Sequence, residues 1–224
     1  MTQDKLEEHI FSTYIGLRAG MVVIAFALPV ILWAGARVFF DTGLQSSISA
    51  YYDTGMRDWF CGILFATGIC LYLYKGFTDE ENIVLNISGV LALGVAVFPY
   101  TWRPFGGSLT PHGVCAVLFF VGIASVCWRR AADTLVLIND ETVKQGFARK
   151  YKMIAAALAV SPLAAVAVNA LGGYDALIFW IEVIGIYIFA YYWWTKGSEL
   201  KQTRALQLVI EKRPDAKPLF EAVK

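Results

Sequence analysis

Six apolar stretches, each about as long as a bilayer is thick, constrain this chain more than any other feature of its sequence. A helix needs roughly 20 mostly apolar residues to cross the hydrocarbon core of a membrane. The stretches come close to that length, and they cover residues 17–36, 58–76, 82–99, 112–129, 152–171 and 176–195. The sequence therefore predicts an all-α membrane protein in which residues 1–224 form one bundle of six transmembrane helices.

The composition agrees with a membrane protein and excludes several other classes. Hydrophobic residues make up 58% of the chain and charged residues only 17%, whereas a soluble domain carries about 25% charge. The net charge of +1 does not favour a nucleic-acid partner, which would require a basic face. No glycine-rich phosphate loop is present, so nucleotide binding has no support. The expected partner is the lipid bilayer, with other membrane subunits or a homo-oligomer left open.

The basic residues predict how the chain is oriented in the membrane. Of the 19 Lys and Arg residues, only Arg37, Arg57 and Arg103 fall beside one set of helix ends. Cytoplasmic loops carry the excess of positive charge. We therefore expect a multi-pass protein of the plasma membrane with both termini in the cytoplasm, including a tail over residues 197–224.

The first outward loop and the start of the next helix are unusually polar for such an apolar chain. They contain Ser49, Asp53 and Asp58. On the same side of the membrane, His112 opens the fourth predicted helix and Asp175 opens the sixth. Together these residues suggest a polar region at the outer face.

Glu182 is the most informative single residue. It follows Asp175 by two helical turns, which places it roughly 10 Å inside the outer end of its helix. A carboxylate at that depth is costly unless it faces the bundle interior or a wet cavity. We therefore predict one outward-open polar pocket whose residues are Ser49, Asp53, Asp58, His112, Asp175 and Glu182. The alternative is that Glu182 forms a structural pair with a Tyr, a Ser or a backbone donor in the core.

A weak internal repeat links the three helices that run from outside to inside. Each has Gly-Ile ten positions after an ionisable residue at its start, with glycines at Gly68, Gly122 and Gly185. Small residues in register allow helices to approach closely. Internal repeats are also found in transporters, where the site lies between the repeats.

Two short patterns carry a family resemblance. Residues 47–54 read Ser-Ile-Ser-Ala-Tyr-Tyr-Asp-Thr and are followed by Arg57-Asp58, and residues 179–182 read Phe-Trp-Ile-Glu. These patterns resemble an uncharacterised family of six-helix integral proteins of the bacterial inner membrane. The resemblance implies the six-helix fold and this location, and it carries no activity.

A more remote resemblance is to the zinc-dependent membrane hydrolases that include alkaline ceramidases and adiponectin receptors. Those proteins have a Ser and a His four residues apart with a nearby Asp. Ser49 and Asp53 stand at the first pair, and Asp58 stands for the Asp. Their last helix also carries a His-x-x-x-His pair, whereas this chain has only His9 and His112.

Two functional classes remain open. The first, which we favour, is a non-enzymatic protein with an outward-facing polar pocket, in a binding, transport or accessory-subunit role. The second is a metal-dependent hydrolase that acts on a lipid at the outer leaflet, with a metal-bound water as nucleophile. Oxygen ligands suit a hard divalent cation, and the candidate ligands would be Asp53, Asp58, His112 and Glu182.

Overall fold

The computed structural model describes residues 3–101, 104, 110–129, 131, 133–138, 140–172 and 175–211, and this part of the chain is helical without any strand. All six predicted helices are present. They are α1 (Gln3–Phe40), α2 (Arg57–Leu73), α3 (Asp79–Val97), α4 (Pro111–Arg129), α5 (Glu141–Ala170) and α6 (Asp175–Glu211). Two short 3-10 helices lie between them, η1 (Ser49–Asp53) and η2 (Asp133–Leu137). The all-α prediction is confirmed.

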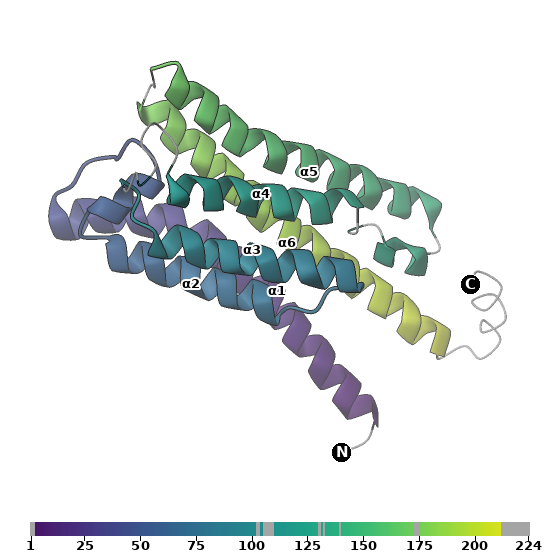
Figure 1. Ribbon diagram of the computed structural model, residues 1–224. Coiled ribbons are helices and arrows are strands. Elements are labelled where there is room, and N and C mark those ends of the chain that lie inside the picture. Colours follow the sequence, from purple (N-terminus) through teal and green to yellow (C-terminus); the bar gives the residue numbers. More distant parts are fainter. Residues whose placement is uncertain are drawn as a thin grey trace.

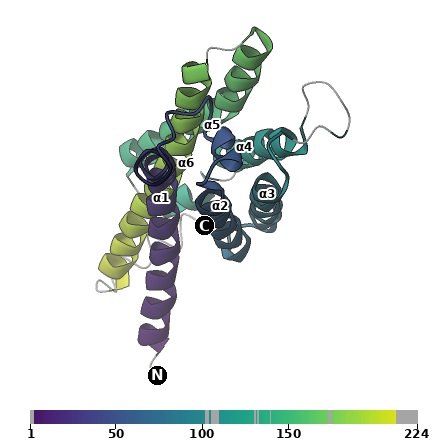
Figure 2. The ribbon, with the colours of Figure 1, turned by 90° about the vertical axis from the view of Figure 1, so that its left-hand side faces the viewer.

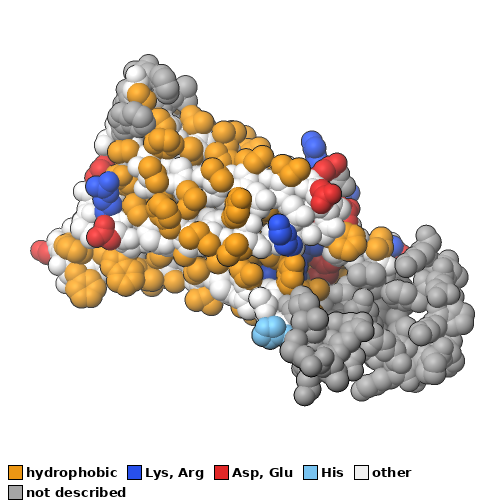
Figure 3. Space-filling view, turned by 60° about the horizontal axis from the view of Figure 1, so that its bottom comes forward, with side chains coloured by type: hydrophobic (Ala, Val, Ile, Leu, Met, Phe, Trp, Pro, Cys, Tyr) orange, Lys and Arg blue, Asp and Glu red, His pale blue; other side chains and the backbone are white. Residues whose placement is uncertain are grey.

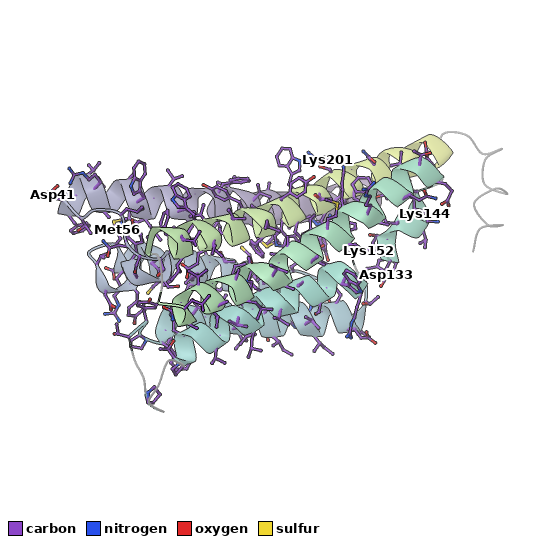
Figure 4. The ribbon with its side chains drawn as sticks, turned by 90° about the horizontal axis from the view of Figure 1, so that it is seen from above. Asp41, Met56, Asp133, Lys144, Lys152 and Lys201 are labelled. Atoms are coloured by element: carbon purple, nitrogen blue, oxygen red, sulfur yellow. The ribbon has the colours of Figure 1, made fainter. Side chains whose placement is uncertain are left out.

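The helices form a closed ring. Each packs against its neighbours in the chain, and α6 also packs against α1 (Figures 1 and 2). Short connections make consecutive helices antiparallel. The bundle therefore has two ends, which Figure 4 marks with Asp41 and Met56 on one side and Asp133 and Lys144 on the other. We call them the first-loop end, which carries residues 41–56, and the terminal end, where α1 begins and α6 ends.

Five of the helices are long and apolar enough to cross a membrane: α1, α3, α4, α5 and α6. The sixth, α2, has 17 residues and spans about 25 Å at 1.5 Å per residue. That is slightly less than the roughly 30 Å of the hydrocarbon core. Because α2 packs between α1 and α3, it runs beside two helices that are long enough to cross.

The outer surface of the bundle is apolar. Figure 3 shows hydrophobic side chains over the middle of one face, with charged side chains mainly toward its ends. Large apolar side chains are exposed on every helix, for example Val23, Ile69, Ile87, Leu118, Leu163 and Ile184. Exposed apolar side chains on every helix are consistent with a membrane protein, because water disfavours large exposed apolar patches.

Two helices begin well before the apolar stretches that predicted them. The apolar stretch predicted a helix from residue 152, but α5 already begins at Glu141. Its start is set by a cap and not by hydrophobicity: Asp140 Oδ1 accepts hydrogen bonds from the amides of Thr142 (2.8 Å) and Val143 (3.2 Å). In the same way α1 begins at Gln3, and α6 continues to Glu211. Exposed polar turns therefore extend α5 beyond the apolar stretch that predicted it.

The glycines of the weak repeat lie where helices touch. A Cβ added at Gly68 of α2 would lie 2.7 Å from the carbonyl oxygen of Gly89 on α3, so the two backbones are in contact there. Gly122 of α4 packs on Ser88 in the same manner, and Gly185 of α6 packs on Ser161. Close approach through small residues is the usual way in which helices associate in a membrane.

Candidate ligand-binding site

A cavity of about 200 Å³ lies inside the bundle at the first-loop end. Three of the predicted site residues line it together: Ser49 before α2, His112 on α4 and Glu182 on α6. Most of the wall is apolar, with contributions from Leu28, Phe60, Leu64, Val95, Ala116, Val117, Phe119, Phe120, Ala165, Val166 and Ile186. The site therefore combines a hydrophobic wall with a few polar groups, as binding sites for small molecules commonly do.

Glu182 connects two parts of the chain. Its Oε2 accepts a hydrogen bond from the amide of Ser49 at 3.2 Å. Ser49 begins η1, and the first amides of a helix have no partner within that helix. The carboxylate supplies one, so the pairing with a backbone donor that we considered as the alternative is present. Glu182 nevertheless also lines the cavity, so the two interpretations are not exclusive.

His112 is buried, with 2% of its surface exposed. Its Nδ1 lies 3.3 Å from the carbonyl oxygen of Phe98. Since a carbonyl oxygen only accepts, Nδ1 is the nitrogen that carries the proton in this contact. Nε2 is then an acceptor, and it is buried without a hydrogen-bond partner among the described residues. An unsatisfied buried polar atom costs about 1–3 kcal/mol, so Nε2 is a natural place for a donor from a ligand.

Aromatic rings fix the orientation of His112. The ring of Phe60 stacks on it at 6.1 Å between centroids, and the rings of Tyr52 and Tyr100 meet it edge-on at 6.3 and 5.6 Å. Tyr52 and Tyr51 are buried, with 4% and 0% exposed. They pack with Phe60 in the hydrophobic core at this end of the bundle and do not themselves line the cavity.

A proline on α5 contributes to the shape of the cavity. Pro162 lies within α5 and cannot donate a hydrogen bond to the carbonyl of Leu158. The hydroxyl of Ser161 donates to that carbonyl at 3.4 Å instead, which is a common solution in membrane helices. Ser161 and Pro162 both line the cavity. Val166, one turn further on, also lines it and is 54% exposed, so the cavity lies close to the outer surface of the bundle at α5.

The other predicted site residues are not part of the cavity. Asp58 is exposed and lies in a surface groove with Trp59 and Gly62, against Ile24 of α1. Phe60, two residues further along α2, lines the cavity. Two residues correspond to about 200° around a helix, so Asp58 lies on the opposite face. The expectation that Asp58 lines the pocket was therefore wrong.

Asp53 and Asp175 are the two remaining residues of the predicted pocket. Asp53 ends η1 with its side chain exposed, and it does not line the cavity. Asp175 begins α6, as predicted, but its side chain lies outside the described residues. Asp53, Asp58, His112 and Glu182 do not converge: the described residues contain no group of three or more His, Cys, Asp or Glu residues that could hold a metal ion. The geometry thus gives the hydrolase alternative no metal centre among these ligands.

A second polar region lies at the terminal end, and the sequence did not lead us to expect it. We call it the terminal cluster, and it consists of Arg18, Tyr74, Thr134, Tyr151, Lys196 and Glu199. Lys196 and Glu199 are 3% and 2% exposed and form an ion pair at 3.4 Å. The hydroxyls of Thr134 and Tyr151 donate to the two oxygens of Glu199. The ammonium of Lys196 also donates to Thr134 Oγ1 at 2.8 Å and to the carbonyl oxygen of Ala131 at 3.0 Å.

Arg18 joins this cluster from α1. Its guanidinium donates to the hydroxyl of Tyr74 and to the backbone carbonyl of Lys196. We had counted Arg18 and Lys196 only as cytoplasmic flanking charges. One feature of the sequence could have predicted the terminal cluster. Lys196 and Glu199 directly follow an apolar stretch and stand three residues apart on one helix, which is close enough for the two side chains to pair.

Comparisons of the chain with known protein families, with curated proteins and with solved structures found no match.

Proposed function

We propose that this protein is a multi-pass membrane protein that binds a small, largely apolar molecule with a hydrogen-bond donor, in the cavity at the first-loop end. The observation that carries the proposal is the pair of acceptors in an apolar wall. One is the carboxylate of Glu182, and the other is the unpartnered Nε2 of His112. A ligand with a hydroxyl or amine group would satisfy either acceptor.

The size of the cavity limits the ligand. Drug-sized ligands occupy sites of about 300–1,000 Å³, whereas an apolar cavity of about 150 Å³ accepts benzene. A volume of about 200 Å³ therefore suits a molecule slightly larger than benzene, such as a substituted phenol. Because Val166 is both part of the wall and exposed, such a molecule would enter from the lipid through the α5 side.

We also propose that the first-loop end faces outward in the plasma membrane, with both termini in the cytoplasm. The support is the basic asymmetry of the sequence, in which only Arg37, Arg57 and Arg103 of the 19 basic residues fall in the segments predicted to face outward. The cavity then opens near the outer leaflet. This orientation fits a binding or transport protein that takes its ligand from that side.

The experiment compares two probes that differ only in the donor, para-ethylphenol and its methyl ether. The purified protein in nanodiscs is titrated with each. A hydrogen bond is worth about 0.5–1.5 kcal/mol with a neutral acceptor and about 1.5–3 kcal/mol with a charged one, so the phenol should bind more tightly than the ether by about tenfold. Equal affinities for the two probes would contradict the proposal.

Glu182→Gln tests whether the preference depends on the carboxylate. The amide oxygen of Gln can still accept from the amide of Ser49, so the link between η1 and α6 is retained while the charge is lost. The preference for the phenol should become smaller but should not disappear, because Nε2 of His112 remains as a second acceptor in the cavity. Glu141→Gln is the control, because Glu141 is exposed at the start of α5 and far from the cavity; that variant should keep the full preference.

A further inference from the structure

A cleft of about 420 Å³ opens beside the terminal cluster. It lies between the first half of α1, the α2–α3 turn and α6, and we call it the terminal cleft. Its wall contains Phe11, Tyr14, Arg18, Tyr74, Lys75, Phe77, Glu81, Thr134, Lys196 and Leu200. Figure 1 shows the first half of α1 diverging from α2 and α3 on this side. The terminal cleft is independent of the cavity at the first-loop end, because the two share no residue.

Arg18 is the first of two charged groups in the terminal cleft that have no oppositely charged side chain in ion-pair contact among the described residues. It is 7% exposed, and its contacts are with a phenol hydroxyl and a backbone carbonyl. Within the described part of the chain it forms no ion pair. A guanidinium has five N–H donors, and these contacts leave some of them for a ligand. A buried charge without a partner is costly, so an anion in the cleft would be favourable.

Glu81 is the second group, and it carries the opposite charge. It is 2% exposed, in the first turn of α3. Its Oε2 accepts from the amide of Phe77 at 2.7 Å, which holds the α2–α3 turn in place. Among the described residues Glu81 has no basic side chain in ion-pair contact. A cation in the cleft would therefore be favourable beside it.

The two lysines that line the terminal cleft are not in ion-pair contact with Glu81. The ammonium of Lys196 is already occupied by Glu199, Thr134 and the carbonyl of Ala131. Lys75 is exposed at the mouth of the terminal cleft. Binding an anion alone would leave Glu81 unpaired, and binding a cation alone would leave Arg18 unpaired. A ligand with one charge of each sign compensates both.

We propose that the terminal cleft binds a zwitterion with a phosphate and an ammonium group, as in the headgroup of phosphatidylethanolamine. The phosphate contacts Arg18 and the ammonium contacts Glu81. The cleft lies at the level where α2 ends and α3 begins, which is the headgroup level of a bilayer spanned by these helices. Phe77 beside it is 62% exposed, as aromatic side chains at the membrane surface commonly are.

The test uses delipidated protein in detergent and three phospholipids with identical acyl chains. Their headgroups are ethanolamine, choline and glycerol, and binding is measured by native mass spectrometry and by the rise in melting temperature. Phosphatidylethanolamine should bind about tenfold more tightly than the other two. Choline cannot donate a hydrogen bond to Glu81, and glycerol supplies no cation. Equal binding of the three lipids by the wild-type protein would overturn the proposal without reference to any variant.

Two variants test which group of the lipid each charged side chain contacts. Arg18→Gln should weaken both phosphatidylethanolamine and phosphatidylglycerol. Glu81→Gln should weaken only phosphatidylethanolamine, since Gln still accepts from the amide of Phe77. Arg37→Gln and Glu141→Gln are matched controls at exposed positions and should leave all affinities unchanged. A Glu81→Gln protein that still prefers phosphatidylethanolamine would contradict the assignment.

A final arm separates a lipid from a free solute of the same chemistry. Phosphoethanolamine is added in competition with the lipid. If it binds much more weakly than the lipid, the ligand is a membrane lipid whose acyl chains contribute; if it binds as tightly, the ligand is the soluble zwitterion. Both results support the site, and failure of phosphoethanolamine and the lipid to bind overturns it.

Discussion

The ion pair between Lys196 and Glu199 should be strongly coupled, because both side chains are almost completely buried. Glu199→Gln removes the charge that compensates the ammonium of Lys196 and leaves it with neutral acceptors, among them the carbonyl of Ala131 and the hydroxyl of Thr134. Lys196→Met leaves the carboxylate of Glu199 with the hydroxyls of Thr134 and Tyr151. Removing one partner of a buried pair costs about 3–5 kcal/mol, whereas replacing both is often nearly neutral. The double variant should therefore be more stable than the sum of the single changes predicts, with a coupling energy of about 2–3 kcal/mol.

The assay is reversible unfolding in mixed micelles with increasing dodecyl sulfate, followed by tryptophan fluorescence. The control is Lys144 and Glu141, a pair with the same three-residue spacing whose side chains are 36% and 66% exposed. Exposed pairs of this kind are worth about 0.3–0.5 kcal/mol. If the buried and the exposed pair show the same small coupling energy, the reasoning about the terminal cluster is refuted.

Three further predictions concern packing, orientation and helix capping. Gly68→Leu should lower the free energy of unfolding by about 1–3 kcal/mol, because its Cβ would lie 2.7 Å from a backbone oxygen of α3; Gly62→Leu on the same helix, with open space around it, should not. In a background without the four native cysteines, a membrane-impermeant maleimide added outside intact cells should label Gly43→Cys and not Gln145→Cys, and the opposite pattern would reverse the proposed orientation. Asp140→Ala should cost about 1 kcal/mol, measured as above, through loss of the cap of α5; unchanged stability would show that the cap does not matter.

Hydrophobicity predicted the number and order of the helices but not where they begin. Apolar stretches identify the part of a helix that lies in the membrane, whereas polar turns such as Asp140 to Val143 extend it in either direction through caps and tertiary contacts. The α5 helix illustrates the difference, since its first turns are charged and its later turns are apolar.

For the candidate site, the cost of burying a carboxylate was a reliable guide to Glu182, and the start of α4 led to His112. The same polarity argument failed for Asp58, because it ignored the face of α2 on which each residue lies. The terminal cluster was missed for a related reason. Charges near helix ends, such as Arg18 and Lys196, were assigned to orientation alone, whereas the structure buries them at 7% and 3% exposure.

The most direct test of the central claim is to fill the cavity at the first-loop end and measure ligand binding. Ala165 of α5 lines the cavity, and Ala167, two residues further on, is exposed and does not. Ala165→Phe places a ring in a space of about 200 Å³, while Ala167→Phe adds the same ring on the outer surface. In a titration with para-ethylphenol, we expect Ala167→Phe to bind like the wild-type protein and Ala165→Phe to lose binding while its melting temperature stays close to that of the wild type. Retained binding in a folded Ala165→Phe protein would contradict the account.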